Sequence, residues 1–334
     1  MSWAITHVSA ITVWQLDCDS QFECDFVATS TKRELQKLEI SSDQIQVEEE
    51  PFTKGWFGKV YKAKWQKSDV AVKVIKVSSV EEAQKAKNEV SLTLRLNHPN
   101  VVSLYGITTV SSRKLGIVME LSDCGSLDQW IGKIHVDRAG TTMIALGIIC
   151  GLEYIHSRNV IHRDIKPRNI LMFGPEDDMN PKIADFGVSK LIQTAAATHT
   201  QTGQELYMAP EVKLLNHYSF PADVFSLAIT LFEMFNEELI QQSSKEVGVF
   251  IRNVHSGRAI EIPQSCKVPE YLRDIIKRGL NDTPEERPSL AEYYATLNGM
   301  TSYFSVYMLT ADIIVVYFCY YMTTFKYTSR SARH

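Results

Sequence analysis

Five groups of polar residues in this chain could carry out chemistry, and they follow one another in a fixed order. Lys73 ends the apolar run VAVK, and Glu89 lies in the charged stretch after it. Three short motifs come next: HRDIKPRN at 162–169, DFG at 185–187 and APE at 209–211. Residues of these types suit phosphoryl transfer, because that reaction spreads negative charge over oxygen atoms and needs cations and two oxygens held in line. Each group alone could arise by chance.

In this order the groups resemble the motifs of eukaryotic protein kinases. The segments VYKAKW, NHPNVVSLYG, GSLDQWI and APEV, with HRDIKPRNIL, are most similar to the tyrosine-kinase-like group of serine/threonine kinases, over about 44–298. The resemblance implies an α+β, bilobal protein-kinase-like fold. An antiparallel-sheet N-lobe with one helix would span about 44–120, and a mainly helical C-lobe about 125–298. The implied function is transfer of the γ-phosphate of ATP to serine or threonine hydroxyls of protein substrates in intracellular signalling.

The resemblance assigns catalytic roles to four residues. Lys73 would contact the α- and β-phosphates and pair with Glu89, for which a solvated helix face is the alternative. Asp164 would orient the substrate hydroxyl and accept its proton. Lys166, a feature of serine/threonine-type members, would neutralise the transferring phosphate. Its alternative is a loop lysine facing water.

Two further residues would hold metal ions. Asp185 would bind Mg²⁺ that bridges the phosphates, and Asn169 would serve a second metal position, because hard oxygen ligands suit a hard cation. Mn²⁺ is the alternative ion. Asp164 and Asn169 have the separation of the family motif H-R-D-x-x-x-x-N, so one loop would deliver both the base and a metal ligand.

The nucleotide site follows from the same resemblance. Gly55 and Gly58 would lie against the phosphates, and Phe57 would cap the region of the loop tip. Thr53 stands where the family usually has a first loop glycine. The adenine would meet apolar residues and the main chain of a hinge, namely Val60, Ala71 and Leu171 around the base, Met119 before the back pocket, and Glu120, Leu121 and Ser122 in the hinge.

An activation segment would follow the DFG motif. Arg163 resembles the arginine that pairs with a phosphorylated residue of this segment through a charge-assisted contact. The partners implied are protein substrates and an activating kinase, with self-phosphorylation as the alternative. Four threonines are the candidate acceptors: Thr194, Thr198, Thr200 and Thr202.

Three residues depart from the family pattern: Thr53, Thr93 and Gln204. Thr93 occupies a position of the regulatory spine that is usually apolar. Gln204 stands where a threonine hydroxyl usually bridges the catalytic aspartate and lysine. None of the three removes a charge that the reaction needs. The alternative function is a pseudokinase, a scaffold that binds nucleotide or partner proteins without efficient phosphoryl transfer.

Periodicity predicts the elements that would position the N-lobe residues. The segments VYKAKW and DVAVKVIKV alternate as antiparallel strands do, and a polar turn separates them. Ala71 and Lys73 share one face of the second strand, and the other face carries three valines, Val70, Val72 and Val74. Ser79 and Glu82 have the spacing of a capping box, which predicts a helix over SSVEEAQKAKNEVSLTLRL.

Helical patterns dominate the C-lobe. The segment TTMIALGIICGLEYIHSRN predicts a helix whose core stripe is Ile144, Ile148, Leu152 and Ile155. Three further helices are expected in ADVFSLAITLFEMF, PEYLRDIIKRGL and SLAEYYATL. By resemblance, Glu211 and Arg287 would form a buried ion pair that braces the lobe, and Asp223 would support the catalytic loop.

Composition narrows the class of protein. A net charge of −4 and the absence of a lysine or arginine run argue against nucleic acid as a partner. The six cysteines form no metal-binding pair, which predicts reduced thiols in the cytoplasm. Cys124, just beyond the hinge, is an ordinary partly exposed cysteine or, in the alternative, a reactive thiol.

The two ends of the chain lie outside the resemblance. Residues 1–43 form an N-terminal extension without a motif or a basic signal-peptide region, and 299–334 form an apolar tail. Residues 303–325 contain no lysine or arginine and are long enough to span a bilayer as a C-terminal anchor. Asp312, near the centre, favours the alternative, an extension packed on the C-lobe or on another subunit.

Overall fold

The computed structural model describes residues 38–55, 58–132, 138–176, 178–185, 205–215, 217–237, 245–256 and 261–298. From Ile40 onward, the described elements belong to one compact unit.

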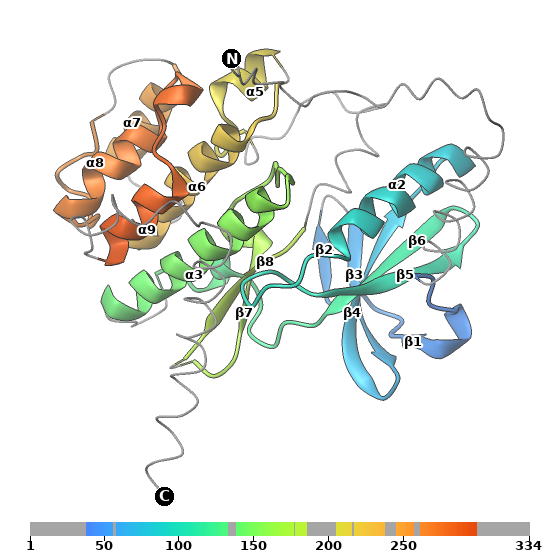
Figure 1. Ribbon diagram of the computed structural model, residues 1–334. Coiled ribbons are helices and arrows are strands. Elements are labelled where there is room, and N and C mark those ends of the chain that lie inside the picture. The colour runs from blue at the N-terminus through green and yellow to red at the C-terminus, as the bar shows by residue number, and fades with distance from the viewer. Residues whose placement is uncertain are drawn as a thin grey trace, which may run out of the picture. The chain divides into compact units, whose positions relative to one another are not determined.

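The N-lobe is an antiparallel sheet with one helix (Figure 1). The strand order is β1-β3-β4-β6-β5, and β2 also pairs with β3. The elements are β1 (Ile45–Val47), β2 (Thr53–Gly55), β3 (Gly58–Trp65), β4 (Ser68–Lys76), α2 (Val80–Thr93), β5 (Leu104–Ser111) and β6 (Lys114–Glu120).

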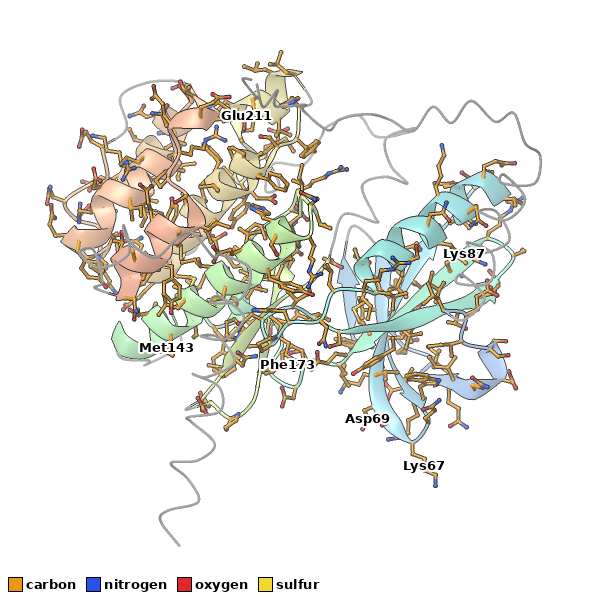
Figure 2. All side chains as sticks on the ribbon, in the orientation of Figure 1. Lys67, Asp69, Lys87, Met143, Phe173 and Glu211 are labelled. Carbon is orange, nitrogen blue, oxygen red and sulfur yellow. The ribbon has the colours of Figure 1, made fainter. Side chains whose placement is uncertain are left out.

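The β3–β4 hairpin confirms the two strands predicted from alternation. Gln66 and Lys67 form its two-residue turn, and both have positive φ, 48° and 69°. This conformation matches the twist of the two strands. Lys67 and Asp69 lie at the free end of the hairpin (Figure 2), where the Lys64 ammonium contacts the Asp69 carboxylate at 2.7 Å.

The two faces of β4 enter different apolar clusters, as the alternation predicts. Ala71 packs in a cluster with Val90 of α2, so the helix covers this face of the sheet. Val72 packs on the opposite face with Ile45. Lys73 shares the face of Ala71 and is only 5% exposed, so its ammonium is held inside the lobe.

The start of α2 confirms the predicted cap. The Ser79 hydroxyl accepts a hydrogen bond from the Glu82 amide at 3.1 Å. In return the Glu82 carboxylate accepts from the amide of Ser78 at 2.6 Å. The bond from the Glu82 amide satisfies a group that a helix start leaves without a partner, and the bond from Ser78 ties the residue before the cap to the same turn.

The described part of the C-lobe is mainly helical and also contains a short β-hairpin (Figure 1). Its main elements are α3 (Arg138–Ser157), β7 (Ile170–Phe173), β8 (Asn180–Ile183), α5 (Pro210–Leu215), α6 (Phe220–Asn236), α7 (Lys245–His255), α8 (Glu270–Gly279) and α9 (Leu290–Asn298). Three of the helices were predicted by sequence segments that match α6, α8 and α9. The predicted core stripe of α3 is also confirmed, since all four of its residues are buried.

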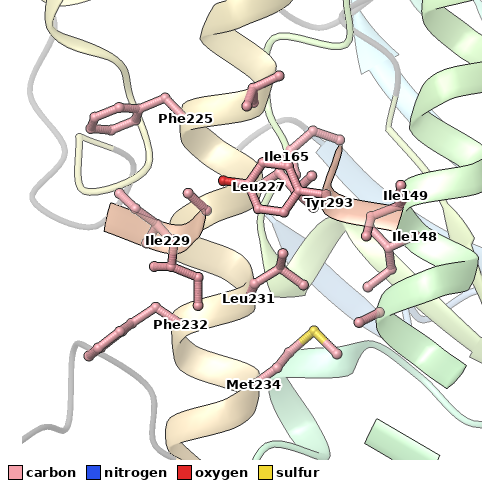
Figure 3. Packing of buried hydrophobic residues seen from close by; sticks show 14 of the residues in the cluster. Ile148, Ile149, Ile165, Phe225, Leu227, Ile229, Leu231, Phe232, Met234 and Tyr293 are labelled. Atoms are coloured by element: carbon pink, nitrogen blue, oxygen red, sulfur yellow. The ribbon is translucent and has the colours of Figure 1, made fainter. Parts of the chain in front are cut away.

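Helix α6 forms the centre of the C-lobe core (Figure 3). Every residue from Ala222 to Asn236 is buried, so the surrounding chain covers this helix on all sides, including its polar residues such as Asp223 and Glu233. Tyr293 of α9 is fully buried beside it, and its hydroxyl donates to the Ile275 carbonyl at 3.1 Å. A side chain at Gly279 would overlap this hydroxyl, so the glycine permits close packing of α8 and α9.

Main-chain bonds join the two lobes next to the DFG motif. Val101 forms a parallel bridge with Ile183 of β8, and the Val102 amide donates to the Ile183 carbonyl at 2.9 Å. The Ile183 amide donates to the Asn100 carbonyl, also at 2.9 Å. The chain that leaves α2 therefore fixes the strand that leads to Asp185. The antiparallel N-lobe and helical C-lobe confirm the predicted fold class.

The expected tail anchor at 303–325 lies outside the described residues. Among the helices that the structure does describe, none is long and apolar enough to cross a bilayer.

Candidate active site

The loop between α3 and β7 brings three of the predicted site residues together. The Lys166 ammonium donates to the Asp164 carboxylate at 2.8 Å. The Asn169 amide nitrogen donates to the same carboxylate oxygen at 2.8 Å and to the Asp164 carbonyl at 2.7 Å. Asp164 and Asn169 are buried, and the Lys166 side chain is mostly so. The predicted base, lysine and metal ligand therefore form one hydrogen-bonded group.

Asp223, at the start of α6, bonds to the main chain of this loop, which confirms the prediction that it supports the catalytic loop. One carboxylate oxygen accepts from the His162 amide and the other from the Arg163 amide, both at 2.8 Å. Arg163 has φ of 69°, a conformation unusual for a residue with a side chain. A loop backbone of this kind persists only when its surroundings fix it, and Asp223 supplies that restraint.

His162 links the loop to the residue before Asp185. Its Nδ1 lies 3.2 Å from the Asp164 amide and accepts from it, so its Nε2 carries the proton and donates to the Ala184 carbonyl at 2.8 Å. Asp185 follows with φ of 66°. The loop of Asp164 and the loop of Asp185 are thus connected through one buried imidazole.

Lys73 of β4 forms an ion pair with Asp185 of the C-lobe. Both residues were predicted to bind the phosphates or their metal, and the structure places them in contact. The predicted partner of Lys73, Glu89, lies in α2, but its side chain is outside the described residues. The Lys73–Glu89 pair therefore stays a prediction.

The residues expected around adenine gather in one apolar cluster. Ala71 and Met119 are buried cross-strand partners in β4 and β6. Val60 of β3, Leu171 of β7 and Leu121 of the hinge are partly buried and pack against the same cluster. The cluster joins the N-lobe sheet to the C-lobe hairpin, and the binding of adenine to it stays a prediction.

The hinge holds a polar contact that the sequence did not predict. Glu120 ends β6, and its amide donates to the Ser103 carbonyl at 2.9 Å. Its carboxylate forms an ion pair with Lys182 of β8, whose ammonium also lies 4.6 Å from the centre of the Phe173 ring. Ser122 donates to the Met172 carbonyl at 2.7 Å. Sequence spacing gives no signal for contacts between residues so far apart in the chain.

The glycine-loop segment forms a β-hairpin. Thr53 of β2 pairs with Val60 of β3, and Gly55 pairs with Gly58. Phe57 lies outside the described residues, and so do the side chains of 53–58. The predicted phosphate contacts of this loop remain predictions.

Cys124 contacts the chain just after β7. The Cys124 thiol donates to the Gly174 carbonyl at 3.0 Å, and burial together with the neighbouring Asp123 raises the pKa of the thiol. A raised pKa disfavours the thiolate and so supports the ordinary cysteine over the reactive one.

Thr93, one of the three departures from the family pattern, is buried. Its hydroxyl donates to the Val90 carbonyl at 2.9 Å, so the polar group that it adds to the interior is hydrogen-bonded.

The chain after the activation segment is anchored to α6 through Tyr207, which the sequence did not single out. The Tyr207 hydroxyl donates to the Glu233 carboxylate, with O–O distances of 2.7 and 2.9 Å. Burial, and then Glu233, raise the pKa of this phenol. The activation segment itself, with Thr194, Thr198, Thr200, Thr202 and Gln204, lies outside the described residues.

The predicted Glu211–Arg287 ion pair is confirmed. The Arg287 guanidinium donates to both oxygens of the Glu211 carboxylate, at 2.7 and 2.8 Å. It also donates to the carbonyls of Pro221 and Asn281 at 2.9 Å. Glu211 lies in α5 (Figure 2), so the pair joins the helix after the activation segment to the segment before α9.

Comparison with known proteins agrees with this geometry. A model of the protein kinase domain matches residues 47–297. A probable serine/threonine-protein kinase of Dictyostelium discoideum is 34% identical over 266 residues, which are 76% of this chain and 19% of that protein. The serine/threonine-protein kinase STY17 of Arabidopsis thaliana is 30% identical over 264 residues, 78% of this chain and 45% of that protein.

A third relative is described as a dual specificity protein kinase, shkE of Dictyostelium discoideum. It is 32% identical over 253 residues, which are 73% of this chain and 35% of that protein. The chain spans less than half the length of each of these three relatives. Because the domain model matches most of the chain, and because the motif residues meet in one site, the chain belongs to the eukaryotic protein kinase family.

Proposed function

We propose that this chain transfers the γ-phosphate of ATP to serine or threonine hydroxyls of protein substrates. The observation that carries the proposal is the hydrogen-bonded group of Asp164, Lys166 and Asn169. A reaction with little covalent chemistry for the protein to perform depends on positioning and charge, and this group supplies both.

The donor set fits Mg²⁺ bound together with a nucleotide. Asn169 uses its amide nitrogen for two bonds to Asp164, which leaves its side-chain oxygen as an acceptor for a cation. Asp185 supplies a carboxylate. Within the described residues no group of three His, Cys, Asp or Glu side chains could hold a metal alone. Mg²⁺ commonly binds through one or two protein ligands and substrate phosphates, so Asp185 and Asn169 suffice, for Mg²⁺ or for Mn²⁺.

The bound Mg²⁺–ATP supplies the phosphoryl group and part of the charge neutralisation. The chain's own residues do the rest. Asp164 holds the acceptor hydroxyl and takes its proton, and Lys166, already bonded to Asp164, neutralises charge beside it. Lys73, whose ammonium is buried, would contact the α- and β-phosphates and would pair with Glu89.

The adenine is proposed to bind the apolar cluster of Val60, Ala71, Met119 and Leu171. Glu120, Leu121 and Ser122 would bond the base through their main chain. Because the Glu120 amide already donates to Ser103, we assign its carbonyl to the base. Gly55, Phe57 and Gly58 would cover the phosphates.

The proposal is tested by radiolabelled phosphate transfer to a generic basic protein and to the chain itself. Wild type is compared with Asp185→Asn, which removes the carboxylate charge at the metal position. We expect transfer by wild type and a loss of at least a hundredfold in the variant. Equal signals would mean a pseudokinase, the alternative raised by Thr53 and Gln204.

Acceptor preference needs its own assay, since one relative is described as a dual specificity kinase. Matched peptides that differ only in serine, threonine or tyrosine at the acceptor position separate the cases. Lys166 beside Asp164 leads us to expect transfer to serine and threonine. Tyrosine phosphorylated at a comparable rate would overturn this assignment.

We further propose a cytoplasmic signalling role, with activation through one of the four threonines named above. Mass spectrometry of active protein would identify the acceptor threonine. Membrane attachment through 303–325 is tested by alkaline carbonate extraction of the full chain, where release into the supernatant counts against an anchor.

A further inference from the structure

One arginine of the loop between α3 and β7 is exposed in a segment that is otherwise covered. Within 161–170, all of which the structure describes, Arg168 is the only exposed residue, and its side chain is 74% exposed. Pro167 and Asn169 on either side of it are buried, and the three residues form the short 3-10 helix η3. The loop of Asp164 therefore presents one cation to solvent from a well-packed backbone.

The partner of Arg168 is much less exposed than Arg168 itself. Arg168 Nε donates to Asp128 Oδ2 at 3.3 Å, and the Asp128 side chain is 19% exposed. Asp128 lies in the 3-10 helix η2 (Leu127–Gln129), and its other oxygen accepts from the Ser126 hydroxyl at 2.5 Å. Among the described residues, the two terminal nitrogens of the guanidinium have no other bond. These nitrogens form the planar fork that matches a carboxylate or a phosphate.

The Arg168–Asp128 pair lies near Tyr207, on the chain that leaves the activation segment. Burial raises the pKa of the Tyr207 phenol most, Glu233 and Asp128 raise it further, and Arg168 lowers it, so both charges of the pair act on this phenol. Tyr207 is itself anchored to Glu233 of α6. Arg168 therefore stands where the loop of Asp164 approaches this chain.

Arg168 is also within reach of the residues that flank an acceptor hydroxyl at Asp164. Its neighbour Asn169 donates to the Asp164 carboxylate at 2.8 Å, and consecutive Cα atoms are about 3.8 Å apart. An extended substrate advances about 3.3 Å per residue, so side chains within about three residues of the acceptor can meet the guanidinium. A carboxylate or phosphate there would gain a charge-assisted bidentate contact, whereas a lysine or arginine would meet a like charge.

We infer that Arg168 is a specificity-determining residue: its exposed guanidinium selects protein substrates that carry an anionic side chain close to the acceptor hydroxyl. The anion is an acidic residue or a residue that is already phosphorylated. The inference rests on the proposed function and adds a class of substrate to it. The alternative is that Arg168 only joins η3 to η2 through Asp128, in which case its loss would affect all substrates equally.

Peptide substrates measure this preference. In a serine peptide, each of the three positions on either side of the acceptor carries aspartate, phosphoserine, asparagine or lysine in turn. For the full chain, we expect kcat/KM at the most responsive position to be at least about tenfold higher for an anion than for lysine, mainly through KM. The larger of the aspartate and phosphoserine ratios identifies the preferred anion. Equal values for all four side chains at every position would overturn the inference.

Three variants separate charge recognition from a structural role. Arg168→Glu should reverse the preference, so that the lysine peptide becomes the better substrate by about tenfold. Arg168→Gln should bring the ratio of anionic to lysine peptide to within about twofold of one. Asp128→Asn weakens the pair but keeps the cation, so it should keep at least the wild-type ratio. If Asp128→Asn and Arg168→Gln instead lower transfer to all peptides by the same factor, the pair is structural and the inference fails.

The matched control is Arg278→Glu, in α8. Arg278 is also an exposed arginine that is paired with an acid, since it lies 3.2 Å from the Glu292 carboxylate. The same reversal of charge should leave the preference for the anionic peptide unchanged. A shift as large as that of Arg168→Glu would mean that net charge, and not a contact of Arg168, sets the preference.

A binding measurement separates this inference from the proposed function. A labelled peptide with alanine in place of the acceptor cannot react, so its Kd for the full chain is measured by fluorescence anisotropy with Mg²⁺ and a non-hydrolysable ATP analogue. We expect wild type to bind the anionic peptide at least about fivefold more tightly than the lysine peptide, and Arg168→Glu to bind it less tightly. If wild type transfers no phosphate, the proposed function fails, while this measurement still decides whether Arg168 selects anionic segments. Equal Kd values for the two peptides would overturn the inference.

Discussion

The two halves of the candidate site are held in different ways. On the C-lobe side, Asp164 is fixed by side-chain donors and by a loop whose amides bond to the buried Asp223. On the N-lobe side, the described contacts are mainly apolar, with Ala71 and Met119 packed in a strand-to-strand cluster. Two charged residues on this side, Lys73 and Glu120, are exceptions, and their ion pairs reach across to Asp185 and Lys182.

This difference matches what the acceptor hydroxyl of the protein substrate and the adenine ring of ATP each require. A proton transfer requires a base held to within a fraction of an ångström, so the acceptor side needs directional bonds. An adenine ring requires mainly an apolar surface and a few main-chain bonds, which a sheet face and a hinge provide. Variants on the two sides should therefore affect different kinetic constants.

The largest effect is expected from Asp223→Ala. The change removes the acceptor of the His162 and Arg163 amides and leaves both without that bond. We expect kcat to fall by at least about a hundredfold, and the free energy of unfolding to fall by about 2–4 kcal/mol. Steady-state kinetics measure kcat, and urea unfolding measures the free energy of unfolding. Asp282→Ala, at an exposed aspartate, is the control. Equally small effects of the two substitutions on kcat and on the free energy of unfolding would show that Asp223 does not hold the loop of Asp164.

The C-lobe scaffold is tested by Glu211→Gln. Arg287 would keep its bonds to two carbonyls but lose the charge that balances it in a buried position. We expect the free energy of unfolding to fall by about 3 kcal/mol. Glu237→Gln removes one charge from the exposed pair with Lys267 and should cost less than about 1 kcal/mol. Equal costs in urea unfolding would show that burial of the Glu211 pair has no consequence.

The N-lobe half is tested by Ala71→Leu. The larger side chain would fill the cluster proposed for adenine and should raise KM for ATP about tenfold, with kcat at saturating ATP within about threefold of wild type. Ala63→Leu is the matched control, because Ala63 is equally buried but packs on the opposite face of the sheet. If Ala63→Leu raises KM as much, the effect comes from distortion of the sheet and not from the adenine site.

The smallest effect is expected from Thr53→Gly. Thr53 lies in β2 as a cross-strand partner of Val60, so its backbone is extended and does not require glycine. We expect KM for ATP to change less than twofold. A fivefold lower KM in the variant would show that the missing loop glycine limits nucleotide binding after all.

Much of the site was predictable because its signals are local or ordered along the chain. The spacing of Asp164 and Asn169, the two faces of β4 and the Ser79 cap depend on residues close in sequence, and the structure agrees with each. The family resemblance added Asp223 and the Glu211–Arg287 pair, whose partners are distant in sequence.

The contacts that were missed have no local signal. His156, Lys182 and Tyr207 each bond to a residue on another element, and only the tertiary fold brings those elements together. Helix α7 was missed for a related reason. It contains Gly248 among β-branched residues of low helix propensity, and burial of Phe250 and Val254 against the core stabilises it instead.

We propose that the group of Asp164, Lys166 and Asn169 is a working phosphoryl-transfer site, and one experiment tests this proposal most directly. Binding of Mg²⁺–ATP by calorimetry and transfer of labelled γ-phosphate are measured in parallel for wild type and Asp164→Asn. We expect both proteins to bind Mg²⁺–ATP with similar affinity and transfer to fall at least about a hundredfold in the variant. Equal transfer by the two proteins, or binding without transfer by wild type, would contradict it.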